Sequence, residues 1–393
     1  MFVVPFMPLY VQHLGVEDAG NAAAWAGIIN GASGATMALV APLWGRLSDR
    51  VGRKIMLLRA TLTAVFVVGA MVFVSAPWQL LILRLLQGTL TGTVPAATAL
   101  VASTAPQEKA GWRLGALQTT IFIAAGVGPA IGGISADAAG LRPSFFIASA
   151  LLAASTALVL FGVVRDRPAQ ASDEERDEEE TSVSLPYRQL LPGLLTLFAV
   201  HVTITSAAVA LPGYVHELSG GFGAIATQAG WIIGTGALVA SVGSLFGGRL
   251  AGRIGTRRMI ALSLALAGLA AIPQALVSNV PELWALRLTT SVFLGGAIPV
   301  ANLLIKNVSP PGRQGAAFGV ASSATAMGFA FGPMGGGLIA SSLGFRAAFL
   351  VPGLALLGLA VVLGVVWTLC LAESGPGKTR LAFLKIILAH LVR

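Results

Sequence analysis

The sequence predicts an all-α integral membrane protein made of two parallel six-helix halves. Three observations carry this prediction: a scarcity of charge, a series of long apolar segments and an internal repeat. Only 10% of the 393 residues are charged, against about 25% in a typical soluble protein. So little charge cannot cover a surface exposed to water, and we therefore expect most of the chain to lie in a lipid bilayer.

Long apolar segments recur along the whole chain. A helix needs about 20 apolar residues to cross a hydrocarbon core of ~30 Å, and eleven segments satisfy this. A twelfth, Met1–Leu14, is shorter and lacks the basic start and the cleavage site of a signal peptide. The eleven expected spans lie near residues 22–44, 55–76, 78–103, 114–136, 144–164, 190–215, 228–247, 258–279, 282–305, 316–340 and 347–371.

Basic residues gather in short clusters between the spans. This pattern is typical of membrane topology, and it argues against nucleic acid as a partner. If Met1–Leu14 is the outer end of a first helix, all lysines and arginines but Arg84, Arg142, Arg287 and Arg346 fall on the side of the two termini or close to it. The positive-inside rule then predicts a multi-pass protein of the bacterial inner membrane with both termini in the cytoplasm.

An internal repeat relates the two halves. GRLSDRVGRK at 45–54 aligns without gaps with GRLAGRIGTR at 248–257, an offset of 203. At an offset of 204, MPLYVQHL at 7–14 aligns with LPGYVHEL at 211–218. Because each half has an even number of helices, both enter the membrane from the same side and the halves are parallel. The seventh span begins near Leu190, so the first helix is expected to lack its cytoplasmic part.

Four parts of the chain follow from the spans and the repeat. Residues 1–164 and 190–372 are expected to form the two halves. Residues 165–189 hold eight of the sixteen acidic residues and predict a disordered acidic linker. Residues 373–393 predict a basic amphipathic tail on the cytoplasmic leaflet. The single cysteine, Cys370, excludes an intramolecular disulfide.

Three motifs resemble those of the major facilitator superfamily. GRLSDRVGRK at 45–54 resembles the loop between the second and third helices, and LRLLQG at 83–88 resembles the fourth-helix motif. AGVGPAIGG at 125–133 resembles the fifth-helix motif of the drug:proton antiporter branch, which includes multidrug and tetracycline exporters. The resemblance covers essentially the whole chain. It implies the twelve-helix major facilitator fold and proton-coupled efflux of lipophilic drugs by alternating access.

The 45–54 loop combines glycines with one carboxylate among basic residues. The glycines permit a tight turn, and Asp49 can cap a helix or bridge arginines. The resemblance implies that this loop latches the outward-facing state; the alternative is a basic loop that only sets topology. Gly252 replaces Asp49 in the second half, so such a latch is asymmetric. Its candidate residues are Gly45, Asp49, Arg50, Gly52, Arg53 and Lys54.

The candidates for ion coupling are Arg84, His201 and Asp137. Arg84 lies about two turns inside a span, where a lone arginine costs ~2.5–3.5 kcal/mol and should face the bundle interior. The resemblance implies a role in proton coupling, with a structural hydrogen-bonding role as the alternative. None of the acidic residues lies in the middle of a span. His201 does lie there and can titrate near neutrality, although a lone membrane histidine can instead join helices.

The fifth-helix motif places small residues at helical spacing around one proline. Small residues let another helix approach closely, and the proline removes a backbone hydrogen bond and bends the helix. The pattern suits an interface at which the halves rock. Its residues are Gly126, Gly128, Pro129, Gly132 and Gly133.

A mainly apolar cavity with few charges suits a small lipophilic substrate better than a sugar or a carboxylate. We find no enzyme signature, no phosphate-binding GxxxxGK[ST] loop and no metal-ligand cluster, and expect a monomer without cofactor. A metabolite or sugar-derivative transporter of the same fold is one alternative, and a non-transporting membrane sensor or scaffold is another. The candidate cavity residues are Asn30, Gln118, Phe122, Trp231 and Asn302.

Overall fold

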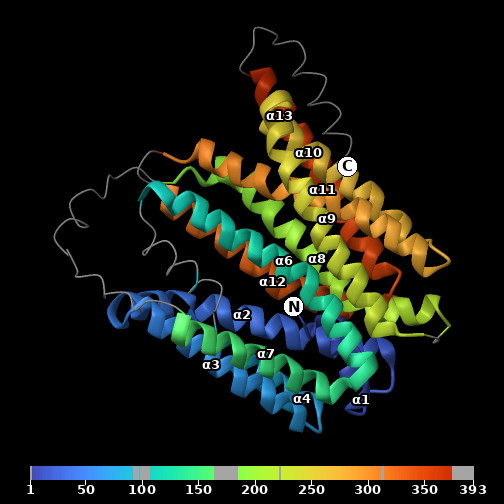
Figure 1. Ribbon diagram of the computed structural model, residues 1–393. Helices are drawn as coiled ribbons and strands as arrows, with labels where there is room; N and C mark the ends of the chain where they lie inside the picture. The colour runs from blue at the N-terminus through green and yellow to red at the C-terminus, as the bar shows by residue number, and fades with distance from the viewer. Residues whose placement is uncertain are drawn as a thin grey trace.

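The computed structural model describes residues 2–91, 97, 107–162, 185–220, 223–310 and 314–373. Within these ranges the regular structure is helical throughout, with no strand (Figure 1). Nine helices in the described ranges are long and apolar enough to cross a membrane. The expected acidic linker and the basic tail beyond residue 373 lie outside the described residues.

The first group of helices comes from the N-terminal part of the chain. It starts with the short elements η1 and α1, whereas the second group of helices starts with a helix of 32 residues. The elements are η1 (Val4–Phe6), α1 (Met7–His13), α2 (Ala19–Val51), α3 (Arg53–Ala70), η2 (Met71–Phe73), α4 (Pro77–Leu90), α6 (Gln107–Ala139) and α7 (Leu141–Gly162).

The second group repeats this order. Its elements are α8 (Tyr187–Leu218), α9 (Ile225–Ile254), α10 (Thr256–Ala271), η3 (Ile272–Ala275), α11 (Val280–Val308), α12 (Gln314–Leu343) and α13 (Ala347–Glu373). Matching helices pack alike: α3 packs on α7 as α10 packs on α13, and α2 packs on α4 as α9 packs on α11. These pairings fit the predicted repeat of two six-helix units.

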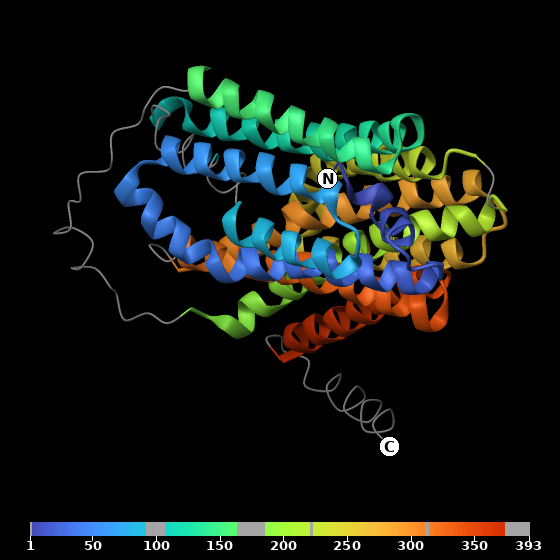
Figure 2. The ribbon, with the colours of Figure 1, turned by 90° about the horizontal axis from the view of Figure 1, so that it is seen from below.

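We call the end of the bundle where α7 ends and α8 begins the linker end, and the opposite end the far end. The groups join along two flanks, α2 with α12 and α6 with α9. In Figure 1 α2, α3 and α7 point toward the left at their linker ends, whereas α9 and α13 point upward. Figure 2 shows α2 and α12 side by side. The two groups therefore meet at the far end and diverge toward the linker end.

Local backbone geometry follows the repeat as well. Gly52 begins α3 with φ of 100°, and Gly255 begins α10 with φ of 91°. Gly140 and Gly344 precede the sixth helix of each half with φ of 97° and 86°. Since only glycine adopts this region at no steric cost, the turns at these repeat positions require it. Gly52 therefore makes the turn between α2 and α3, whereas Gly45, which was expected to permit the same turn, lies inside α2.

Candidate functional site

The fifth-helix motif forms one flank between the two groups of helices. A Cβ atom on Gly230 of α9 would overlap the carbonyl oxygen of Pro129, and one on Gly234 would overlap that of Gly126. A Cβ on Gly133 would in turn overlap the carbonyl oxygen of Ala226. The backbones of α6 and α9 thus touch directly, as close packing through small residues requires. Gly132 instead meets the backbone of Phe2, and Gly128 is half-buried.

The other flank repeats these contacts at equivalent positions. Gly27 of α2 meets the carbonyl oxygen of Pro333, and Gly31 meets that of Ala330. Gly337 meets the carbonyl oxygen of Ala23. Every one of these residues lies 203 or 204 positions from its counterpart on the first flank. The fifth helix of each half therefore packs on the second helix of the other half.

Two buried arginines occupy equivalent positions in α4 and α11. Arg84 and Arg287 are both 8% exposed, in agreement with the expectation that Arg84 faces the bundle interior. Arg84 donates from Nη1 to Oε1 of Gln87 at 3.1 Å, while its Nε and Nη2 have no partner among the described residues. Arg287 donates from Nη2 to the carbonyl oxygen of Ile204 at 3.4 Å. No carboxylate in the described part of the chain pairs with either guanidinium, so both charges are held by neutral groups.

His201 lies one layer behind the α2–α12 flank. Its Nδ1 is 2.8 Å from the carbonyl oxygen of Leu197, and its ring packs on that of Phe329 with centroids 5.0 Å apart. The backbone of Phe329 in turn meets Gly34 of α2. His201 thus contacts α12 at a residue whose backbone meets α2. Asp137 lies elsewhere, in the last turn of α6, where its Oδ2 accepts a hydrogen bond from the backbone of Thr227.

The 45–54 loop is described only in part. Helix α2 runs through Gly45, Asp49 and Arg50, but the side chains of these residues and of Arg53 lie outside the described set. Lys54 donates from Nζ to the carbonyl oxygen of Leu160 at 3.0 Å, tying α3 to the end of α7. The role of Asp49 as a latch stays a prediction.

The expected cavity residues lie on several helices. Asn30 on α2 and Asn302 on α11 are half-buried, while the side chains of Gln118 and Phe122 lie outside the described set. Trp231 is 45% exposed and lines a hollow of about 350 Å³ at the far end of α8, α9 and α11 together with Trp284 and Gln228. Neither Asn30 nor Asn302 lines this hollow. The prediction that these five residues line a substrate cavity stays a prediction.

Sequence reasoning missed a stacked pair in the first half. The guanidinium of Arg59 on α3 lies over the Trp44 ring of α2, with Cζ 3.4 Å from the ring centroid. Trp44 donates from Nε1 to the carbonyl oxygen of Thr89 on α4 at 2.6 Å. The pair joins three helices near the linker end. Gly247 and Leu262 stand at the equivalent positions of the second half, so the repeat gave no signal for it.

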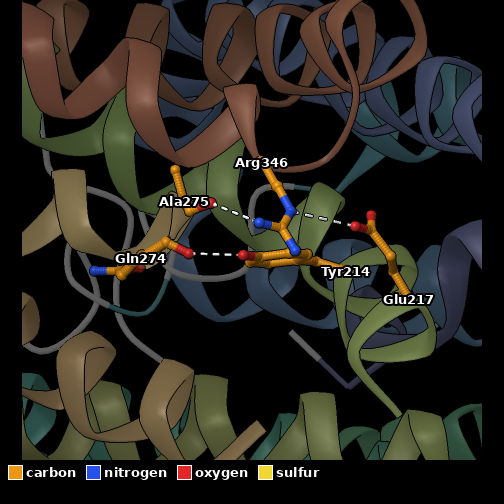
Figure 3. A network of polar contacts seen from close by, with 5 residues as sticks. All are labelled: Tyr214, Glu217, Gln274, Ala275 and Arg346. Carbon is orange, nitrogen blue, oxygen red and sulfur yellow. Dashed lines mark hydrogen bonds and ion pairs between the residues drawn. The ribbon is translucent and has the colours of Figure 1, made fainter. Parts of the chain in front are cut away.

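It also missed a polar corner at the far end of each half. Figure 3 shows the corner of the second half, where Tyr214 donates to the carbonyl oxygen of Gln274 at 2.8 Å. Arg346 donates to the carbonyl oxygen of Ala275 at 3.4 Å and to Oε1 of Glu217 at 3.3 Å (Figure 3).

The corner of the first half is built alike. Tyr10 donates to the carbonyl oxygen of Met71 at 2.7 Å, and Arg142 to that of Val74 at 3.4 Å. His13 stands where the second half has Glu217. The aligned segments at 7–14 and 211–218 contained this signal.

Comparisons with known proteins show which family has this architecture. The family model of the Major Facilitator Superfamily matches residues 1–220 and 193–386. "Multidrug resistance protein MdtG" of Proteus mirabilis is 36% identical over 348 residues, covering 88% of this chain and 87% of that protein. "Multi-drug resistance efflux pump PmrA homolog" of Lactococcus lactis is 33% identical over 367 residues, covering 93% and 89%. The structure of the human organic anion transporter MFSD10 (TETRAN) superimposes with a TM-score of 0.63 at 18% identity, over 92% of this chain and 94% of that one.

Proposed function

The chain belongs to the major facilitator superfamily, and from this premise we propose that it exports small lipophilic compounds across the bacterial inner membrane by alternating access. The observation that carries the proposal is the pair of matched flanks. Two helical groups that touch backbone to backbone at the far end and diverge toward the linker end have the form of one state of a rocking pair. Residues 1–164 and 190–372 would be the two moving bodies.

The substrate class and the direction of transport come from the relatives and the motifs. Both bacterial relatives carry multidrug resistance in their names. The fifth-helix motif that resembles the drug antiporter branch makes the α6–α9 flank of this chain. Few fixed charges inside the bundle favour lipophilic compounds over sugars, whose hydroxyl groups need many polar partners.

The clusters of basic residues support an orientation. Arg249, Arg253, Arg257 and Arg258 lie where α9 ends and α10 begins, at the linker end. The positive-inside rule assigns such clusters to the cytoplasm. The linker end and both termini would then be cytoplasmic, and the arrangement would be the inward-facing state of a monomeric transporter.

Protons are the proposed coupling ion. His201 is a titratable group well inside a span, and its contact with Phe329 connects it to a flank that must move. Arg84 is a second candidate, because a buried charge whose Nε and Nη2 have no partner among the described residues responds to any change in the charge of its surroundings.

Growth of an exporter-deficient bacterial host on a panel of drugs tests the proposal. The intact chain should raise the inhibitory concentration of several lipophilic drugs. Arg84→Ala should lower the initial efflux rate at least about tenfold, equivalent to ~1.4 kcal/mol, and Arg188→Ala at an exposed site on α8 should not. If resistance never rises, or if Arg84→Ala exports as well as the parent, the exporter proposal fails and the metabolite-transporter alternative gains.

A further inference from the structure

The carboxylate of Asp137 joins the two halves at the far end of the α6–α9 flank. Oδ2 of Asp137, on α6, accepts a hydrogen bond of 2.7 Å from the backbone N–H of Thr227, on α9. We propose that Asp137 is a far-end latch: it caps α9 from the opposite half and so favours the state in which the far ends are closed. This role differs from the ion coupling for which sequence reasoning had selected the residue.

The negative charge of Asp137 is unfavourable for its own helix, and its interaction with α9 offsets this. It lies in the last turn of α6, where the helix dipole disfavours a negative charge. Helix α9 begins after Ala224, which offers no side-chain acceptor to the first turn. Thr227 is the third residue of α9, whose N–H is one that a capping side chain normally takes. Asp137 supplies the missing acceptor and meets the positive end of a dipole instead of a negative one.

Among the described residues of the other flank there is no equivalent of this bond. Helix α2, the counterpart of α9, is capped within its own half, because Oδ1 of Asp18 accepts from the N–H of Asn21 at 2.7 Å. The counterpart of Asp137 is Ser341, and its Oγ donates to the carbonyl oxygen of Leu338 in its own helix. The glycine contacts of the two flanks match, so the difference lies in this one polar interaction.

The latch rests on the proposed alternation of access. A bond that crosses between the halves at the far end must break when the far ends separate, whereas the Asp18 bond within one half need not. Deleting a capping side chain typically changes an equilibrium about fivefold. Removal of the Asp137 acceptor should therefore shift the population toward the far-end-open state by about that factor.

Distances between spin labels on the two halves test this directly. Phe73 and Leu276 are equivalent far-end positions, one in each half, and both are 77% exposed. Cysteines at these two sites, with the native Cys370 replaced by serine, would carry the labels on the full chain in lipid nanodiscs. Asp137→Ala should raise the fraction of long distances about fivefold, while Asp18→Ala, the matched control, should leave the distribution as in the parent. Asp137→Asn keeps an acceptor oxygen and should stay close to the parent.

Thr227→Pro removes the same bond from its other side. A first-turn N–H has no partner within its own helix, so a proline is tolerated there better than farther along. This variant should open the far end as Asp137→Ala does. If Asp137→Ala is not produced in the membrane, Thr227→Pro still tests the latch. Asn21→Pro on α2 is its control. An unchanged distribution in the variants that lack the bond, or an equal shift in the Asp18 and Asn21 controls, would overturn the latch. No substrate is needed, so a chain that exports no drug of the panel can still show it.

Discussion

The two flanks between the halves differ in chemistry but hardly in shape. On both flanks a glycine of the second helix meets the carbonyl oxygen of a proline in the fifth helix: Gly230 with Pro129, and Gly27 with Pro333. Among the described side chains, a carboxylate reaches across on the α6–α9 flank and not on the α2–α12 flank. The comparison separates two functions of an interface, because close backbone packing sets where the halves can touch and one polar contact adds a preference for one state.

Adding side-chain volume to a flank should have the largest effect. In Gly230→Val the new atoms would overlap the Pro129 carbonyl oxygen, and overpacking costs about 1–3 kcal/mol. The ratio of far-end-closed to far-end-open molecules should fall at least about fivefold, as measured by the spin-label distances, and drug efflux should fall with it. If the two flanks are packed alike, Gly27→Val on the α2–α12 flank should have the same effect.

The control for this substitution lies on the same helix. A Cβ on Gly248 of α9 meets no atom within 4 Å. Gly248→Val therefore changes the helix propensity of α9 as Gly230→Val does, but adds no atom to the flank. If Gly248→Val opens the far end as far as Gly230→Val does, close packing is not what holds the flank.

Much of this architecture could be predicted from the sequence. Hydropathy predicted the spans because lipid forces every backbone polar group into helices. The repeat predicted the matched packing because equivalent residues such as Gly27 and Gly230 occupy equivalent sites. Gly126 and Gly133 of the fifth-helix motif lie against α9, since small residues around Pro129 let another backbone approach.

The polar contacts of the site could not be predicted in the same way. Asp137 bonds to a backbone group 90 positions away in the other half, and no side-chain pattern marks an N–H that needs a cap. Trp231 was predicted among the cavity residues, and it lines a far-end hollow with Trp284. Which face of a helix meets which neighbour depends on its rotation in the bundle, and hydropathy does not determine that rotation.

The tyrosines of the two polar corners should contribute less to stability than the flanks do. Tyr10 and Tyr214 are fully buried, and each donates one hydrogen bond to a backbone carbonyl. Tyr10→Phe and Tyr214→Phe should each cost about 0.5–1.5 kcal/mol, because a buried carbonyl loses its partner. Thermal unfolding of the purified chain should show two similar decreases of about 1–4 °C. Tyr187→Phe, at a tyrosine that is 59% exposed, is the control, and unequal losses would mean that the two corners are not equivalent.

The ion pair of the second corner should contribute least. Arg346 and Glu217 are 50% and 46% exposed, and an exposed pair typically contributes 0.2–1 kcal/mol that salt screens. Glu217→Gln should lower the unfolding temperature by about 1–2 °C at low ionic strength and leave it unchanged in ~1 M salt, where the Debye length is about 3 Å. A loss that persists at high salt would mean that Glu217 acts by hydrogen bonding or packing. In that event Glu217 would hold its corner by a contact that does not depend on charge. The first half has His13 at the equivalent position, so the two corners would then differ in structure as well as in charge.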